Sequence, residues 1–274
     1  MKSLQSKFAD VAGIRTHYID EGSGDPIVLI HGGGAGADGY SNWVETVPLL
    51  ATDARVIAVD MVGFGKTDKP DPGNYVYSQQ ARNEHLARFI EALGLRRATL
   101  VGNSMGGATA IGVAASRPEL VGRLVLMGSA GVTRHLPPSL KPLINYDFTR
   151  EGMIALMRVL CTERFKIDDK MVDYRFTNAL NADARRAYGD IMGWVRQQGG
   201  LYYEEDFIRR VQAPTLVING KQDKVVPLSD AMRMLDLIPK SWAYFIPDCG
   251  HWAMLEHPRD FASATLNFIR NAHD

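Results

Sequence analysis

Ser104, Asp223 and His251 are the residues whose types and positions could perform nucleophilic catalysis. Ser104 lies in Gly102-Asn-Ser-Met-Gly106, which fits the pattern G-x-S-x-G, between a short apolar stretch and a run of small residues that Pro118 closes. A strand, a tight turn and a helix are the context that exposes such a serine. Because a serine hydroxyl is a weak nucleophile, it requires a base and a group that orients the base. Asp223 and His251 each follow a short apolar stretch, which predicts positions just past two strand ends.

Other residues compete for these roles. Asp248 is three residues from His251, a spacing that disfavours a place behind the ring, so Asp223 is the expected acid. Cys249 has no nucleophile turn and is expected to be a buried bystander. The histidines on expected strands or helices are interpreted as structural or exposed: His17, His85 and His257.

Acyl transfer also needs N–H groups that stabilise an oxyanion. Met105, directly after the serine, should supply one backbone N–H. The other should come from Gly33 in His31-Gly-Gly-Gly34, because a loop without side chains lets the backbone approach a substrate. His31 is expected to brace this loop and not to act in catalysis.

The elements that must position these residues alternate between short apolar strands and helices. Strands are expected twice within 8–19, at 27–30, 55–59, up to 101, and at 124–127, 215–218 and 243–246. Helices are expected at 43–50, from an N-cap at Ser78 to Gly94, at 107–115 and at 261–269. Nearly continuous apolar strands are typical of a parallel sheet covered on both faces. The sequence therefore predicts an α/β fold with a mostly parallel, doubly wound sheet of about eight strands.

The alternation stops between residues 131 and 209. Three prolines mark the entry, and helical patterns follow at 152–160 and 170–180. A helical insert after the sixth strand predicts a lid over Ser104, with core parts at 1–130 and 210–274 and the lid at 131–209. The insert is rich in aromatic residues; most are expected to pack it against the core, and a few to line a pocket.

Composition narrows the function classes. The 274 residues contain 31 Lys+Arg and 31 Asp+Glu, so a zero net charge gives no indication of nucleic-acid or anionic-membrane binding. No apolar stretch approaches the ~20 residues of a membrane span, and the first residues lack the apolar segment of a secretory signal. Cys161 and Cys249 show neither zinc nor disulfide spacing. We expect a cytoplasmic protein with free thiols.

The chain as a whole resembles the α/β-hydrolases. More narrowly, it resembles the meta-cleavage product hydrolases, which cleave carbon–carbon bonds in aromatic degradation. The segments that carry the resemblance are His31–Ala37, Ser41-Asn42, Gly102–Ala108, Leu126–Gly128, Ile144–Arg150 and Cys249–Trp252. Asn103 and Trp252 discriminate, because common esterases of this fold more often have His or Tyr before the serine. Ala35 departs from the family, where relatives often carry proline.

The resemblance implies a serine hydrolase that breaks the C5–C6 bond of a 2-hydroxy-6-oxohexa-2,4-dienoate (EC 3.7.1.-). The products would be 2-hydroxypenta-2,4-dienoate and a carboxylic acid. The lid segment favours a bulky aryl group at C6. Neither metal nor organic cofactor is implied, and a homodimer or higher homo-oligomer is expected because relatives commonly dimerise. A carboxylesterase or another serine hydrolase on the same triad is the alternative.

The resemblance also assigns roles to particular residues. Ser104, Asp223 and His251 match the catalytic triad, and Gly33 and Met105 match the oxyanion hole. The positions that hold the acid end of the substrate are matched by Gly34, Asn42, Asn103, Arg175 and Trp252. Arg175 has chemical support as well, because a fork-shaped guanidinium suits a carboxylate; the alternative is a solvated helix arginine.

Overall fold

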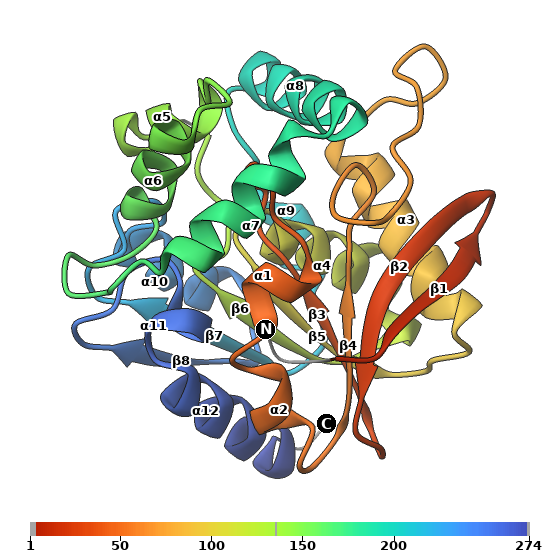
Figure 1. The fold of residues 1–274 in the computed structure, drawn as a ribbon. Coiled ribbons are helices and arrows are strands. Elements are labelled where there is room, and N and C mark those ends of the chain that lie inside the picture. The colour runs from red at the N-terminus through yellow and green to blue at the C-terminus, as the bar shows by residue number, and fades with distance from the viewer. Residues whose placement is uncertain (1–3, 135, 273–274) are drawn as a thin grey trace.

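Eight strands form a sheet in the order β1-β2-β4-β3-β5-β6-β7-β8 within residues 4–134 and 136–272, which the computed structural model describes (Figure 1). The strands are β1 Ser6–Val11, β2 Ile14–Glu21, β3 Pro26–Ile30, β4 Arg55–Val59, β5 Ala98–Asn103, β6 Val121–Met127, β7 Thr215–Gly220 and β8 Ser241–Ile246. Strand β2 is antiparallel to β1 and β4, and the remaining pairs are parallel. The expected sheet of about eight mostly parallel strands is confirmed.

The central strands are apolar throughout because helices cover both faces of the sheet. Strands β3 to β7 are almost wholly buried, whereas β1 and β8, at the two edges, are largely exposed. Helices α3 and α4 pack together on one face, and α2 and α12 pack together on the other (Figure 1). This arrangement leaves the carboxyl ends of the parallel strands as the edge where loops can carry functional groups.

The helices of the core are α1 Gly39–Trp43, α2 Val47–Leu50, α3 Gln79–Ala92, α4 Met105–Ser116, η1 Pro118–Leu120, α10 Leu228–Leu237, α11 Ala253–Glu256 and α12 Pro258–Asn271. Helix α3 begins after Ser78, whose side chain accepts a hydrogen bond from the Ala81 backbone N–H. The single helix expected at 43–50 is wrong, because α1 and α2 are separate. Pro48 lies at the start of α2, and its ring would clash with a continuous helix.

The helical segment between β6 and β7, residues 131–209, is called the insert below. Its helices are η2 Pro138–Leu140, α5 Lys141–Ile144, α6 Arg150–Val159, α7 Asp169–Leu180, α8 Ala182–Gln198 and α9 Glu205–Ile208. The insert stands above the sheet in Figure 1, with α7 packed against α1 and α9 against α4. Strands β6 and β7 pair directly beneath it, with Leu124 opposite Thr215. The insert therefore leaves the sheet continuous.

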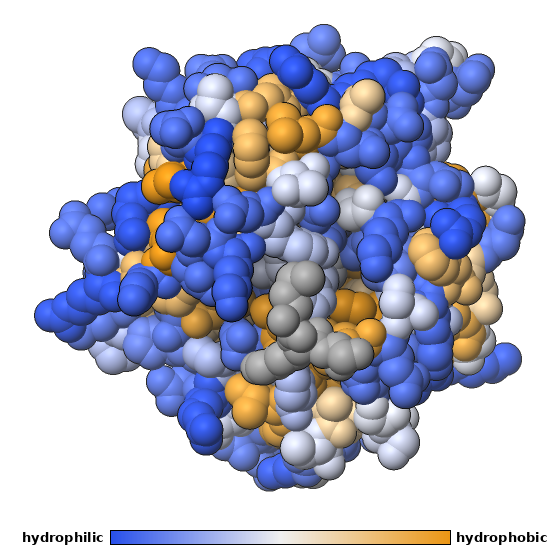
Figure 2. All heavy atoms as spheres, in the orientation of Figure 1, coloured by the Kyte–Doolittle hydropathy of each residue, from blue (hydrophilic) through white to orange (hydrophobic). Residues whose placement is uncertain are grey.

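The surface is largely hydrophilic on the face of Figure 1, and apolar side chains gather there in small separate patches (Figure 2). Among the described residues, no helix has the length and apolar character needed to cross a membrane.

Candidate active site

Ser104 occupies a strained turn between β5 and α4. Its backbone angles, φ +54° and ψ −118°, lie in a region that residues with side chains rarely adopt. The turn is held by hydrogen bonds from Ser104 N to Met127 O (3.2 Å) and from Ala130 N to Ser104 O (3.1 Å). The end of β6 and the segment after it thus hold Ser104 in this conformation.

The flanking glycines are sterically required. A Cβ at Gly102 would lie 2.5 Å from Gly106 O, and a Cβ at Gly106 would lie 2.3 Å from Ile30 O. No side chain fits at either position without moving the backbone. The G-x-S-x-G pattern therefore reflects close packing of the turn against α4 and β3.

Asp223 and His251 meet above the carboxyl ends of β7 and β8. His251 Nδ1 donates to Asp223 Oδ2 at 2.8 Å, since a carboxylate can only accept. The other oxygen, Oδ1, accepts from Val225 N (2.8 Å) and Val226 N (2.9 Å), which locks the carboxylate in place. His251 Nε2 is buried and has no hydrogen-bond partner among the described residues. The ring is thus oriented with Nε2 free to accept a proton.

Asp248 and Cys249 are the alternatives to the catalytic acid and the nucleophile. Asp248 is exposed, and its carboxylate accepts a hydrogen bond from Arg164 Nη1 at 2.8 Å. Cys249 is fully buried, and burial raises the pKa of its thiol. Neither residue has the environment of a catalytic acid or a reactive thiolate.

Gly33 and Met105 lie next to each other. A Cβ at Gly33 would be 2.9 Å from Met105 Sδ. Met105 is the first residue of α4, where a backbone N–H has no intrahelical acceptor. His31 supports the same loop: its Nδ1–H donates to Gly32 O (2.8 Å), and its Nε2 accepts from Met61 N (3.0 Å). Burial lowers the pKa of His31, consistent with a neutral ring committed to the backbone.

A polar cluster lies beside this loop. Asn42 Nδ2 donates to Asn103 Oδ1 at 3.2 Å, and Asn103 Nδ2 donates to Met127 O at 3.1 Å. Arg175, from α7 of the insert, places its guanidinium carbon 5.1 Å from the ring centroid of Trp252. A Cβ at Gly34 would lie 2.9 Å from Arg175 Nη2. These contacts form two groups, and Ser41, the neighbour of Asn42, connects them through its hydrogen bond with Arg175. The five residues expected to hold an acid group therefore lie in one region, which we call the polar cluster.

The charge of Arg175 is not neutralised by a direct ion pair among the described residues. The side chain is almost fully buried, at 1% exposure. Its hydrogen bonds to Ser41 Oγ (3.4 Å) and Ala35 O (3.3 Å) are long, and Nε has no partner. Burial lowers the pKa of Arg175 to about 10. A buried, underpaired cation is suited to an anionic ligand.

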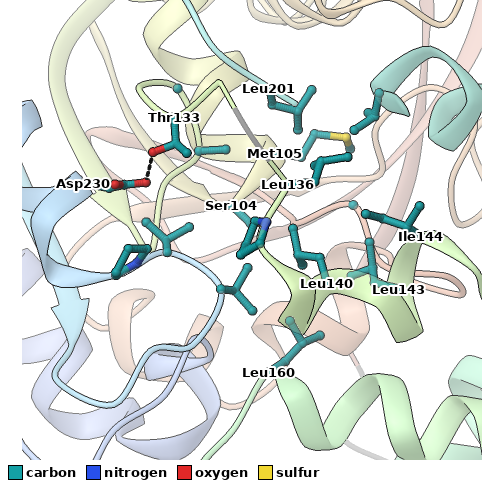
Figure 3. A pocket seen from close by; sticks show the side chains of 18 of the residues that line it. Ser104, Met105, Thr133, Leu136, Leu140, Leu143, Ile144, Leu160, Leu201 and Asp230 are labelled. Carbon is teal, nitrogen blue, oxygen red and sulfur yellow. Dashed lines mark hydrogen bonds between the residues drawn. The ribbon is translucent and has the colours of Figure 1, made fainter. Parts of the chain in front are cut away.

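Ser104, Gly33 and Met105 border a cavity of about 220 Å³ (Figure 3). Its remaining lining is mainly aliphatic, with Thr133, Ser229 and Asp230 as polar members. The apolar residues of this lining are Ala130, Leu136, Pro137, Leu140, Leu143, Ile144, Leu160, Met192, Val195, Leu201, Val225, Val226 and Pro227. In the described part of the chain, no group of three or more His, Cys, Asp or Glu side chains could hold a metal ion.

The expectation that aromatic residues of the insert line the pocket is wrong for this cavity, since none occurs among its described lining residues. They pack with one another instead: Tyr146 lies 4.9 Å from Phe148, and Tyr203 stacks on Phe207 at 4.8 Å between ring centroids. Aromatic pairs bury large areas in such contacts. Aliphatic side chains therefore form most of the lining of the cavity.

Comparison with known proteins places this geometry in a family. A model of the alpha/beta hydrolase fold matches residues 25–258. The chain belongs to the α/β-hydrolase family. Within it, the 2-hydroxy-6-oxo-6-(2'-aminophenyl)hexa-2,4-dienoic acid hydrolase of Metapseudomonas resinovorans is 52% identical over 98% of this chain and 92% of that protein. A 2-hydroxymuconate semialdehyde hydrolase of Pseudomonas sp. (strain CF600) is 35% identical over 95% of this chain and 92% of that protein.

Comparison of this α/β-hydrolase with solved structures leads to the same family. A serine hydrolase involved in carbazole degradation, the CarC enzyme, superposes with a TM-score of 0.91 and 50% identity, over 98% of this chain and 100% of that chain. The meta-cleavage product hydrolase of Pseudomonas fluorescens IP01 gives a TM-score of 0.91 and 34% identity, over 97% and 98%. The hydrolase is therefore a member of the meta-cleavage product hydrolases.

Gly128 is a residue of this hydrolase that the sequence did not single out for a role. It follows β6 with φ +49°, and a Cβ there would lie 2.9 Å from His251 Nδ1 and 3.0 Å from Asp223 Oδ2. Its missing side chain leaves room for the His–Asp pair. A glycine directly after a buried strand is the one signal that could have found it.

A separate Ser–His–Asp set, joined by hydrogen bonds, involves the β1–β2 hairpin of the hydrolase. Ser6 Oγ is 2.6 Å from His17 Nε2, and His17 Nδ1 is 2.8 Å from Asp60 Oδ2. Ser6 lies on the regular edge strand β1 and not in a strained turn. His17 is buried, which fits a structural role. The hairpin chain of hydrogen bonds ties β1 and β2 to the end of β4.

Proposed function

We propose that this hydrolase cleaves the C5–C6 bond of a 2-hydroxy-6-oxo-6-arylhexa-2,4-dienoate, giving 2-hydroxypenta-2,4-dienoate and an aromatic carboxylic acid. One observation carries the proposal. The serine turn borders an aliphatic cavity, and the adjacent Asn103 belongs to a polar cluster that contains the underpaired cation of Arg175. A 6-aryl dienoate has matching parts: an apolar ring, an electrophilic carbonyl and a carboxylate.

In this proposal Asn42, Asn103, Arg175 and Trp252, with the backbone at Gly34, hold the 2-hydroxy-carboxylate end. The aryl group occupies the aliphatic cavity. The C6 carbonyl then lies between the two regions, beside Ser104. Binding both ends restricts the substrate to one orientation, which is how positioning lowers the barrier of a reaction.

The proposed chemistry begins with ketonisation. The 2-hydroxyl proton is transferred to C5 with the help of His251, which leaves a 2-oxo group conjugated through the C3–C4 double bond. Ser104 attacks C6 while His251 Nε2 accepts the hydroxyl proton, and Asp223 stabilises the imidazolium that forms. The backbone N–H groups of Gly33 and Met105 stabilise the oxyanion; loss of one such donor typically costs ~3–4 kcal/mol.

Cleavage of the C5–C6 bond follows from that arrangement. The electron pair of the bond passes into the conjugated 2-oxo system, which is the electron sink. Protonation of the resulting dienolate gives 2-hydroxypenta-2,4-dienoate. The acyl group remains on Ser104 until water, activated by His251, releases the carboxylic acid. The net reaction consumes one water molecule and requires no redox partner.

We also propose that the insert acts as a lid domain, residues 131–209, between core parts 1–130 and 210–274. Arg175 supports this, because the insert contributes the cation of the polar cluster. The outer ends of the core parts, residues 1–3 and 273–274, lie outside the described residues. A cytoplasmic location and a homodimer or higher homo-oligomer remain proposals. The buried free thiols of Cys161 and Cys249 are compatible with a reducing compartment, and light scattering tests the oligomeric state.

The test is a steady-state comparison of dienoates with phenyl, 2-aminophenyl, isopropyl or methyl groups at C6, followed by loss of their visible absorbance. We expect cleavage of all, with the highest kcat/KM for an aryl substrate. Hydrolysis of a nitrophenyl ester without cleavage of any dienoate would overturn the proposal in favour of an ordinary esterase. A preference for the methyl substrate would overturn the aryl assignment alone.

A further inference from the structure

The carboxylate of Asp38 joins the core to the insert at the polar cluster. Asp38 lies between the loop of Gly33 and helix α1, and its side chain is buried, at 3% exposure. Oδ1 accepts from Ser41 N at 2.6 Å, while Asp38 N donates to Ser41 Oγ at 3.3 Å. This reciprocal capping fixes the start of the helix that carries Asn42.

The second oxygen of Asp38 binds the insert. Oδ2 accepts from Tyr174 OH at 2.6 Å and from Asn178 Nδ2 at 3.2 Å, both on α7. These two donors are one helical turn apart, and Arg175 lies between them in the sequence of α7. One carboxylate therefore holds two helices, α1 through Oδ1 and α7 through Oδ2.

The same contacts place the guanidinium of Arg175. Its Nη1 reaches Ser41 Oγ at 3.4 Å, and Ser41 is the residue that Asp38 caps. The Asp38 charge favours the ionised form of Arg175 without forming an ion pair with it. The cation is thus supported by a nearby negative charge, while its Nε, which has no partner among the described residues, can still donate to a ligand.

We propose that Asp38 is a positioning residue that sets the distance between Arg175 on the insert and Asn42 on the core, and so determines affinity for the carboxylate end of the ligand. The proposal rests on the proposed function for the identity of the substrate. It concerns a residue that touches the cluster and not the reacting atoms.

Asp38→Asn tests the proposal. Asparagine keeps the size and the capping acceptor of α1, but it loses the charge and an acceptor for α7. Tyr174→Phe removes one donor to the same carboxylate and keeps the ring that packs against Tyr40 of α1. Asp168→Asn is the matched control, because Asp168 is the exposed N-cap of α7 and accepts from Lys170 N at 3.1 Å.

The readout that does not depend on the dienoate is inhibition of nitrophenyl acetate hydrolysis by 2-oxopentanoate, which carries the acid end alone. We expect the Ki to rise about 10-fold in Asp38→Asn and about 3-fold in Tyr174→Phe. Hydrolysis of the ester itself should change less than about 2-fold, since no carboxylate is bound. With a 6-phenyl dienoate, KM should rise in parallel while kcat stays within about 3-fold.

A double variant separates positioning from general destabilisation. In an Arg175→Ala background, Asp38→Asn should raise the Ki little further, because the cation it positions is gone. The proposal would be overturned if Asp38→Asn weakened ester hydrolysis and inhibitor binding equally. It would also be overturned if the effects of Asp38→Asn and Arg175→Ala on the Ki were fully additive. Absence of inhibition of the wild-type enzyme by 2-oxopentanoate would overturn it too. Cleavage of the ester but of no dienoate contradicts the proposed function alone. If Asp38→Asn does not fold, Tyr174→Phe decides by the same criteria.

Discussion

The hydrolase contains a Ser–His–Asp chain of hydrogen bonds in its hairpin and a His–Asp pair at the candidate active site, and their difference shows what a serine hydrolase site requires. In the hairpin, Ser6, His17 and Asp60 are linked at 2.6 and 2.8 Å. At the strand ends, His251 and Asp223 are linked at 2.8 Å. Both histidines use Nδ1 toward the carboxylate, but Nε2 of His17 contacts a serine hydroxyl whereas Nε2 of His251 has no hydrogen-bond partner among the described residues.

The surroundings of the two serines differ. Ser104 lies in a strained turn at the start of α4, beside the Met105 N–H, the Gly33 loop and an aliphatic cavity. Ser6 lies on a regular edge strand. Oxyanion stabilisation and substrate positioning supply much of the rate enhancement of serine hydrolases. A hydrogen-bonded triad is therefore insufficient without the turn and cavity.

The sharpest test of this contrast replaces each serine. Ser104→Ala should lower kcat for the dienoate by about 10⁴- to 10⁶-fold, because it removes the nucleophile. Ser6→Ala should leave kcat within about 2-fold, since surface changes away from a site have small effects. Steady-state absorbance measurements decide. A Ser104→Ala enzyme with normal turnover would refute the serine mechanism, and a large loss in Ser6→Ala would break the contrast.

The carboxylates give the second test. Asp223→Asn should lower kcat by about 10³- to 10⁴-fold, because the amide favours the wrong tautomer of His251. Asp248→Asn is the matched control and should leave kcat nearly unchanged, since Asp248 is exposed and contacts Arg164. Kinetics at saturating substrate measure both. If Asp248→Asn is the damaging change, the assignment of the acid is wrong.

Two glycines give a third, smaller effect. Gly128→Ala should reduce kcat by about 10- to 100-fold with little change in KM, because its Cβ would press on the His251–Asp223 pair. A Cβ at Gly65 would lie 2.1 Å from Asp60 Oδ2. Gly65→Ala should therefore lower the unfolding midpoint in urea instead. Loss of stability without loss of kcat in Gly128→Ala would contradict the positioning role.

The smallest effect concerns pH and the hairpin region. His85 Nε2 is 2.9 Å from Thr16 Oγ1, and burial lowers the pKa of His85 to about 4. A histidine whose folded pKa is depressed stabilises the fold above pH 6.5, and this contribution is lost as pH falls toward 4. The loss should reach about 2–3 kcal/mol. His85→Gln should weaken the pH dependence of the free energy of unfolding, measured by urea unfolding between pH 7 and 4. An unchanged pH dependence would contradict its origin in His85.

The parts of the site that could be predicted have local signals. Ser104 is flanked by glycines that the turn requires, and Asp223 and His251 follow apolar strands in the order typical of the fold. The break between α1 and α2 was predicted wrongly, as one helix at 43–50, although Pro48 is a local signal for it. These features depend on neighbours in the chain, so the sequence alone suffices to predict them.

The parts that could not be predicted depend on tertiary packing. The bond between Ser6 and His17 requires the register of β1 against β2, and the role of Asp38 requires the docking of α7 on α1. The aliphatic lining of the cavity depends on which faces the insert helices turn toward Ser104. An aromatic-rich composition carries no information about that choice, because aromatic side chains can pack equally well with one another.

The direct pairing of β6 and β7 beneath the insert has a consequence for how the enzyme is made. The chain synthesised before the insert contains Ser104, whereas Asp223 and His251 come after it. During synthesis the nucleophile is therefore complete long before its base. Joining β7 to β6 closes a long loop, a kind of contact that forms slowly. We therefore expect activity to appear during refolding only after β7 has joined β6, because Asp223 and His251 follow β7 in the chain.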